Sequence, residues 1–480
     1  MSKHSRRDFL RNAGGGLGAF TIGGLIGTTG VFSSLQAAEL EATHPLAPKA
    51  PHFPARAKSV IWLHMIGAPA TQDLFDHKPL LEKLHGQAVP ESFLQGIQTS
   101  TQGGVGKLLG SHRQWQQHGQ SGSWFSDFLP HLAGHADELA YIHSSITIGA
   151  THDISVIKLN TGALTPGRPA LGAWIQYALG SANQNLPGYL VLSNGGRGLE
   201  SGSVNYNAGF LPAVYSGVPL ALGEEPILYL ERPGLMTAKQ QRRDLELLKR
   251  FNQYHADRYP ADTEIRARTE AYELAERMQA TVPGVVDLDK ESAATRALYG
   301  LDEEATREYG TNLLRARRLV ENDVRFVHVV SGMADGEKDW DAHDDLITNH
   351  TKQARMVDKP VAGLLADLKS RGLLDSTLVV WTSEFGRTSY GESGSGRDHN
   401  PWGYTQWLAG GGVKAGVHYG RTDEIGLQNA DEATAVDTYD LHATVLNQLG
   451  LDHLKVTYLN QGRSERPTVV YGRVVKELLA

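Results

Sequence analysis

Four runs of apolar and β-branched residues recur along the chain, separated by polar stretches with helical spacing. Uninterrupted apolar runs predict strands buried on both faces, as in parallel sheets covered by helices. The alternation of such strands with helices therefore predicts an α/β fold with a mainly parallel sheet. The predicted strands are residues 59–65, 189–192, 324–330 and 377–382, and the predicted helices are 173–179, 237–278, 304–322, 352–371 and 440–449.

The first 38 residues have the pattern of an export signal. Arg6-Arg7 precedes a glycine-rich apolar stretch, residues 14–32, and Ala37-Ala38 supplies small residues at a cleavage site. This order predicts a twin-arginine signal at 1–38, a Pro/Ala-rich leader at 39–58 and a single catalytic-type domain at 59–480. A plain Sec signal or an uncleaved anchor are the alternatives. We expect the twin-arginine translocase as a partner, a periplasmic or extracellular location, and no permanent membrane span in the mature protein.

The amino-acid composition limits the kinds of site and partner that the chain can have. The 480 residues include no cysteine and carry a net charge of −7. The missing cysteine excludes disulfides, thiolate zinc sites, iron–sulfur clusters and a cysteine nucleophile. The acidic balance argues against nucleic acid as a partner. Any metal would have to be held by carboxylates and histidines.

Such residues follow the predicted strands. Ligands of open α/β sheets bind beyond the carboxyl ends of the strands, so these positions matter most. A lone Asp-x-His is more often a surface loop, but several clusters after successive strands predict one shared metal site. Carboxylate with imidazole suits zinc or manganese, and carboxylates alone suit magnesium or calcium. The candidates are Asp73, Asp341, His343, Glu384 and His399, with Arg387 beside them.

Hydroxyl groups gather in the segment 142–153, ahead of a predicted helix that leads to Thr161-Gly162. A hydroxyl at a helix N-terminus gains from the dipole, which favours an alkoxide or a bound anion. Ordinary N-capping by serine or threonine is the alternative. The open candidates for a nucleophile are Ser144, Ser145, Thr147 and Thr151.

Several long strings in order resemble the bacterial "domain of unknown function 1501" family: LHMIGAPATQDLFDHKP, LGAWIQYALGSANQNLPGYLVL, WDAHDD, LVVWTSEFGRT and GRDHNPWGYTQWLAGGGVKAG. The resemblance covers nearly the whole chain from Ser59 onward. It implies membership of the alkaline phosphatase-like superfamily, with its sulfatases and phosphodiesterases. The fold implied is a large three-layer α/β sandwich. The superfamily holds one or two divalent metals at strand ends and uses a Ser, Thr or formylglycine nucleophile.

The resemblance also assigns residues. Asp341 and His343 resemble the superfamily's metal-binding Asp-x-x-x-His pair with a shortened gap, and His399 resembles its late histidine. Glu384-Phe385 stands where Asp-His is usual, and a phenylalanine cannot ligate, which leaves the second metal site incomplete. Asp73 is the candidate for the early carboxylate, with His64 as the competing choice.

For catalysis, Thr147 followed by His152 resembles the phosphodiesterase nucleophile segment. No C/S-x-P-x-R string occurs in this segment, so a formylglycine mechanism is not expected. Arg387 or Arg397 would bind the ester oxygens through forked hydrogen bonds, with salt bridges to nearby acids as the alternative for both.

Two functions stay open at this stage. The first is an exported, metal-dependent hydrolase of phosphate or sulfate esters of small molecules or glycans, with zinc, manganese, magnesium or calcium as cofactor. The second is a catalytically degenerate member that binds anionic glycans or scaffolds other exported proteins. The retained Asp341, His343, Glu384 and His399 favour the first, and Phe385 favours the second.

Overall fold

The computed structural model describes residues 44–97, 104–194, 199–220, 236–259, 263–332, 338–391 and 394–480. The predicted export signal at 1–38 and the start of the predicted leader lie outside these residues. Residues 44–58 run along the surface, where main-chain hydrogen bonds join Lys49 to Leu179 and Ala57 to Gln448. No described helix is both long and apolar enough to cross a bilayer.

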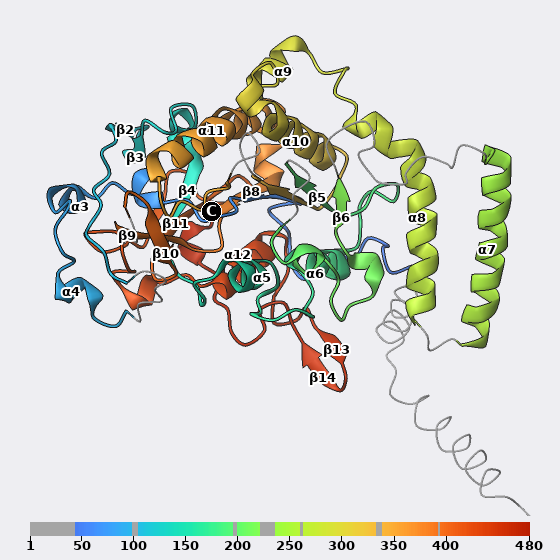
Figure 1. Ribbon diagram of the computed structural model, residues 1–480. Coiled ribbons are helices and arrows are strands. Elements are labelled where there is room, and N and C mark those ends of the chain that lie inside the picture. Colours follow the sequence, from blue (N-terminus) through green and yellow to red (C-terminus); the bar gives the residue numbers. More distant parts are fainter. Residues whose placement is uncertain are drawn as a thin grey trace, which may run out of the picture.

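An eight-stranded sheet forms the centre of the protein, in the order β12-β4-β11-β8-β1-β7-β5-β6 (Figure 1). Every neighbouring pair is parallel except the two that involve β11, which runs against both β4 and β8. The predicted α/β class with a mainly parallel sheet is therefore confirmed. The strands are β1 Ser59–His64, β4 Leu139–Ser145, β5 Tyr189–Ser193, β6 Val218–Leu220, β7 Phe326–Val330, β8 Thr377–Thr382, β11 Tyr404–Ala409 and β12 His418–Tyr419.

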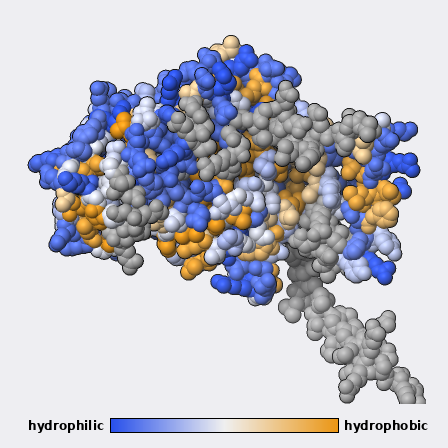
Figure 2. Space-filling model, viewed as in Figure 1, coloured by the Kyte–Doolittle hydropathy of each residue, from blue (hydrophilic) through white to orange (hydrophobic). Residues whose placement is uncertain are grey.

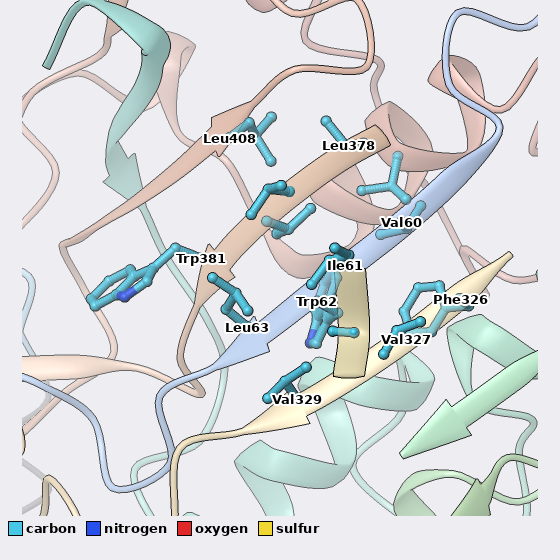
Figure 3. Close-up of a cluster of buried hydrophobic side chains, with 14 of the residues drawn as sticks. Val60, Ile61, Trp62, Leu63, Phe326, Val327, Val329, Leu378, Trp381 and Leu408 are labelled. Atoms are coloured by element: carbon cyan, nitrogen blue, oxygen red, sulfur yellow. The ribbon is translucent and has the colours of Figure 1, made fainter. Parts of the chain in front are cut away.

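The three central strands are buried along their whole length. β1, β7 and β8 carry no exposed residue, and their side chains pack together on both faces of the sheet (Figure 3). Val60, Leu63 and Val329 are fully enclosed in this cluster. Burying a side chain of this size contributes about 1.5–3 kcal/mol. Two-sided burial explains why the sequence shows continuous apolar runs here instead of alternation.

Helices cover both faces of the sheet and complete three layers (Figure 1). One layer contains α10 Glu304–Glu321 and α11 Leu346–Ser370, and the other contains α5 His152–Thr161, α6 Leu171–Leu179 and α12 Thr438–Gln448. α11 ends before Gly372, whose φ of +66° suits glycine, as the sequence predicted. α12 begins with a capping box in which Asp437 and Asp440 bond reciprocally to the main chain.

The predicted helix 237–278 is divided in the structure. α7 spans Ala238–Arg258 and α8 spans Thr263–Val286. The sequence places Pro260 between them, and proline disfavours helix for the residue before it, which the prediction overlooked. The strands β4, β6, β11 and β12 were also missed. Polar residues such as those of His143-Ser144-Ser145 interrupt the apolar runs of β4 and β11, and β6 and β12 are only three and two residues long.

Smaller elements surround the sheet. The most important for the site is the antiparallel pair β9 Gly386–Gly391 and β10 Arg397–Asn400, which turns back over the carboxyl end of β8. Two further hairpins and three short helices lie at the surface. They are β2 Trp115–His118 with β3 Ser123–Ser126, β13 Tyr458–Asn460 with β14 Arg463–Glu465, α3 Pro79–Lys83, α4 Glu91–Leu94 and α9 Ala293–Leu298.

Candidate metal centre

The polar residues predicted from the sequence lie beyond the carboxyl ends of β1, β7 and β8. The loop after β7 carries Asp341 and His343, β10 carries His399, and α5 begins with His152. Two glycines let these segments approach each other closely. A Cβ on Gly67, whose φ is +96°, would lie 2.4 Å from the Asp339 carboxylate, and a Cβ on Gly396 would lie 1.9 Å from the main chain of His343.

One ligand atom from each of His152, Asp341, His343 and His399 converges on a single point. All four atoms lie within 4.8 Å of one another. Asp341 Oδ1 is 3.2 Å from His152 Nε2, 2.9 Å from His343 Nε2 and 3.5 Å from His399 Nε2, and the last two nitrogens are 3.0 Å apart. Ligands held at 2.0–2.1 Å in a tetrahedron lie about 3.3 Å apart, so these separations fit a zinc-sized ion.

The second ring nitrogens of two of these histidines are tied down. His152 Nδ1 donates to Glu384 Oε1 at 2.7 Å, and His399 Nδ1 donates to the Ala150 carbonyl at 2.6 Å. A proton held on Nδ1 leaves the Nε2 lone pair free for a metal, which is the usual carboxylate–histidine arrangement around metal sites. The site thus has the outer contacts that orient metal ligands.

The buried Nε2 of His152 has no hydrogen-bond partner within the described part of the chain. Its 3.2 Å contact with Asp341 Oδ1 is an ion pair that lacks hydrogen-bond geometry. A divalent cation at the shared point would satisfy this nitrogen. The donor set of three imidazoles and one carboxylate suits zinc or manganese better than calcium. The residues present therefore fit a metal.

The charges of the metal-free site are strongly perturbed. Burial disfavours the charged imidazole of His152, but the neighbouring carboxylates of Asp341 and Glu384 outweigh this effect and raise its pKa to about 10. Burial also disfavours charge on Asp341, yet its contacts with His152, His343 and His399 and the charge of Arg387 hold its pKa well below its usual range. The pKa of Glu384 is lowered despite full burial, because His152 and His64 donate to it. Two carboxylates thus remain ionised beside each other.

Glu384 lies behind the four ligand atoms. It accepts hydrogen bonds from Gly67 N at 2.8 Å, Ser383 Oγ at 3.1 Å and His64 Nε2 at 3.2 Å, in addition to His152. All its acceptor positions are occupied by the protein, and its side chain is fully buried. The sequence predicts Glu384 as a direct ligand; in the structure it is not among the four residues whose ligand atoms converge, and its Oε1 accepts from His152 Nδ1.

A buried histidine pair extends this network into the sheet. His64, at the end of β1, lies 3.4 Å (Nδ1) from Nε2 of His328 on β7, and the two rings stack. Burial lowers the pKa of His328 well below its ordinary value. His328 was missed because it sits inside an apolar run, where a histidine gives no separate signal.

The Asp73 carboxylate bonds to Arg397 and not to the four ligand residues. Its carboxylate receives two hydrogen bonds from Arg397, at 2.8 and 3.3 Å, and both side chains are almost completely buried. Arg397 also donates to the carbonyls of Thr388 and Leu109. The structure thus pairs Asp73 and Arg397 with each other, and Asp73 is not among the four residues whose ligand atoms converge.

Arg387 lies against the site but is fully buried. Its donors reach the carbonyls of Ala68, Gly67 and Arg397, the Asp341 carboxylate and His343 Nε2. A guanidinium has five N–H donors, so these contacts use them all. The salt-bridge alternative stated for this arginine describes its contacts better than substrate binding does.

The four candidate nucleophiles differ in their contacts. Ser144 Oγ donates to the Thr434 carbonyl at 2.6 Å, and Ser145 Oγ donates to the Ile142 carbonyl at 3.3 Å. Thr147 is buried and its amide donates to Pro401 O, next to the strand that carries His399. Thr151 is the N-cap of α5, is exposed and makes no side-chain capping bond. Thr147 and Thr151 therefore both remain candidates for the nucleophile.

Phe385, the residue that departs from the superfamily pattern, is fully buried. Its ring lies 4.9 Å from the ring of His152 and 4.6 Å from that of His399, centroid to centroid. It occupies the inner side of both imidazoles, where it excludes water and offers no ligand atom. The sequence predicted a catalytic role for His152, whereas the structure groups its Nε2 with the ligand atoms of Asp341, His343 and His399.

Over residues 57–479 the chain matches the model of a family described as "Protein of unknown function (DUF1501)". Among curated proteins, none matches it. It is similar to three solved structures: a protein of the alkaline phosphatase superfamily from Vibrio parahaemolyticus (10% identity, 95% of this chain and 80% of that one, TM-score 0.38), the PsFucS1 sulfatase from Pseudoalteromonas sp. (12%, 87% and 71%, 0.35) and the lipoteichoic acid synthase LtaP from Listeria monocytogenes (10%, 86% and 78%, 0.31). At these scores we base the function on the geometry of the site.

Proposed function

The chain belongs to the DUF1501 family, as its motifs predicted, and from that premise we propose that it is an exported, divalent-metal-dependent hydrolase of phosphate or sulfate esters. The observation that carries the proposal is the convergence of three imidazole nitrogens and one carboxylate oxygen on one point. The buried Nε2 of His152 makes an ion-pair contact with Asp341 but no hydrogen bond within the described residues, and a metal ion at this point would give it a ligand bond.

His152, Asp341, His343 and His399 would hold the ion. Bound there, a divalent metal lowers the pKa of a coordinated hydroxyl or water and stabilises charge on the ester oxygens. Glu384 fixes His152 through its Nδ1 proton, and Arg387 fixes the Asp341 carboxylate. The side chain of Asp341 is one-third exposed (33%), which leaves the centre open to a substrate.

The start of α5 favours an anionic substrate. His152 is the first residue of this ten-residue helix, so the unpaired amides of its first turn and the positive end of the dipole lie beside the centre. Thr147 is the proposed nucleophile and Thr151 its competitor. A Thr147→Val variant should lose hydrolysis while keeping its metal, and the same result for Thr151→Val instead would transfer the role to that residue.

Metal analysis of the purified chain tests the proposal first. We expect about one divalent ion per chain, with loss of the ion in His343→Ala and Asp341→Asn. His418→Ala is the matched control, because His418 also lies in a close histidine pair, 2.8 Å from His143, on the far strands of the sheet. A parent protein without zinc, manganese, magnesium or calcium would refute the metal centre.

Turnover is tested with p-nitrophenyl phosphate and p-nitrophenyl sulfate on the metal-loaded protein. Hydrolysis that disappears in His343→Ala supports the hydrolase. Hydrolysis that survives that change places the activity elsewhere. A protein that binds metal but hydrolyses no ester is the degenerate alternative, which the full occupation of the Arg387 donors favours.

A further inference from the structure

α7 is the helix farthest from the sheet, standing beyond α8 at the edge of the protein (Figure 1). Its start is fixed by a capping box between Thr237 and Gln240. One face of α7 contacts α8: Gln241 Nε2 donates to Gln279 at 2.9 Å, and Lys249 Nζ lies 2.8 Å from the Glu273 carboxylate. These contacts settle which side of α7 is directed toward the rest of the protein.

The opposite side of α7 carries an apolar stripe. Leu247, Phe251 and Tyr254 are four and three residues apart, so at 100° per residue they share one face, turned away from Gln241 and Lys249. Their exposed fractions are 52%, 64% and 67%. Figure 2 shows hydrophobic residues gathered over α7 among hydrophilic ones. Large aromatic side chains exposed in a row mark an interaction surface.

Basic residues border this stripe. Arg243, Arg250 and Arg258 fall on the same side of the helix as the apolar residues, together with Asp244 and Asp257, and all five are exposed. α7 as a whole carries six basic and three acidic residues, although the chain has a net charge of −7. The helix is therefore a local positive feature on an acidic protein, and its charge complements an anionic surface.

We propose that α7 is an interfacial docking helix that lies on a bilayer containing anionic lipids. An exposed aromatic and aliphatic face with arginines beside it is the pattern of helices that rest in the headgroup region. The arginine stems can lie along the apolar layer while their guanidinium groups contact lipid phosphates. This role is independent of the metal centre and would hold the protein at a membrane surface without a spanning helix.

The narrowness of the stripe favours a lipid surface over a protein partner. A stable protein interface buries about 800 Å² on each side with shape complementarity. Three apolar side chains on one helix supply only part of that area. A bilayer needs no matching shape, and the few inserted side chains act together with the attraction of the arginines. Self-association through α7 is therefore an outcome to be excluded by experiment.

A site-specific reporter tests the proposal, and the cysteine-free sequence makes it straightforward. Phe251→Cys in the full chain is labelled with a fluorophore that brightens in apolar surroundings. Leu459→Cys, on β13 and 71% exposed, is the matched control. We expect brightening at residue 251 with phosphatidylcholine vesicles that contain phosphatidylglycerol, little change with phosphatidylcholine alone, and no change at residue 459.

The charge contribution is measured with Arg243→Gln and Arg250→Gln, using a Tyr254→Cys reporter. Each change should weaken vesicle affinity about fivefold, because one basic residue at an anionic surface contributes a factor of about five to the binding constant. An unchanged signal at residue 251 while the chain sediments with vesicles overturns the proposal, because residues 14–32 would then account for the attachment. Brightening that depends on protein concentration without vesicles also overturns it and indicates a second copy as the partner.

Discussion

Replacing Glu384 by glutamine tests the centre at the residue that orients a ligand without being one. The amide oxygen can keep the bonds to Gly67 N and His152 Nδ1, and Ser383 can rotate to accept from the new NH2 group. The fold should therefore tolerate Glu384→Gln. What changes is the negative charge behind His152, which strengthens that imidazole as a ligand.

Loss of such an outer carboxylate costs about 10–100-fold in metal affinity, or about 1.4–2.7 kcal/mol. A second effect opposes it. The same carboxylate helps to raise the pKa of His152 to about 10, so in the metal-free protein a proton occupies Nε2 at neutral pH and has to leave when a metal binds. Glu384→Gln lowers that proton affinity as well. The loss of metal affinity should therefore be largest near pH 9.5 and smaller at pH 7.

The assay is zinc competition against a coloured chelator at both pH values. Asp358→Asn is the matched control. Asp358 is another buried carboxylate, which accepts hydrogen bonds from the amides of His131 and Leu132 on the other side of the protein. The control should alter stability and leave zinc affinity unchanged. Equal zinc affinity of Glu384→Gln and the parent at both pH values would refute the orienting role.

Three further predictions follow from buried contacts. Asp73→Asn should destabilise the protein by about 3–5 kcal/mol, because it leaves Arg397 buried without its counter-charge, and it should not change the metal content. Denaturant unfolding measures the stability and metal analysis measures the content. Loss of metal from a folded variant would restore Asp73 as a ligand. Arg387→Lys should lower metal affinity and stability, since a lysine cannot make the five contacts, with little effect on the KM for an ester; a raised KM alone would make Arg387 a substrate ligand. Burial lowers the pKa of His442 to about 4, against about 6.5 in the unfolded chain, so its contribution to stability is present above pH 6.5 and is lost as the pH falls toward 4. His442→Gln should therefore flatten the plot of the free energy of unfolding against pH between these values. An unchanged slope of that plot contradicts the assignment.

The sequence located the central strands because they are buried on both sides. Nothing polar interrupts Val60-Ile61-Trp62-Leu63 or Leu378-Val379-Val380-Trp381, so their apolar runs stand out. β4 and β11 carry buried polar groups such as Ser144 and Gln406, which the fold satisfies with distant partners. A local pattern cannot show a partner that lies far away in the chain.

The sequence predicted which kinds of side chain form the candidate site better than it predicted how they contact one another. Asp341, His343 and His399 follow strands of one sheet, and the carboxyl ends of parallel strands meet at one edge, so their approach follows from the pattern. The role of Glu384 did not follow. A carboxylate after a strand looks the same in sequence whether it contacts the metal point or stands behind His152.

The sequence by itself determined the fold class, the family and the kinds of groups available, because burial patterns and residue chemistry are local properties. Only the tertiary structure decided which charged side chains pair with each other. It paired Asp73 with Arg397, surrounded Arg387 with three main-chain carbonyls, Asp341 and His343, and brought His152 from the start of α5 to the Asp341 carboxylate. In a buried site of low polarity each charge must find its partner within a few ångströms, and that pairing is set by how the chain folds back on itself.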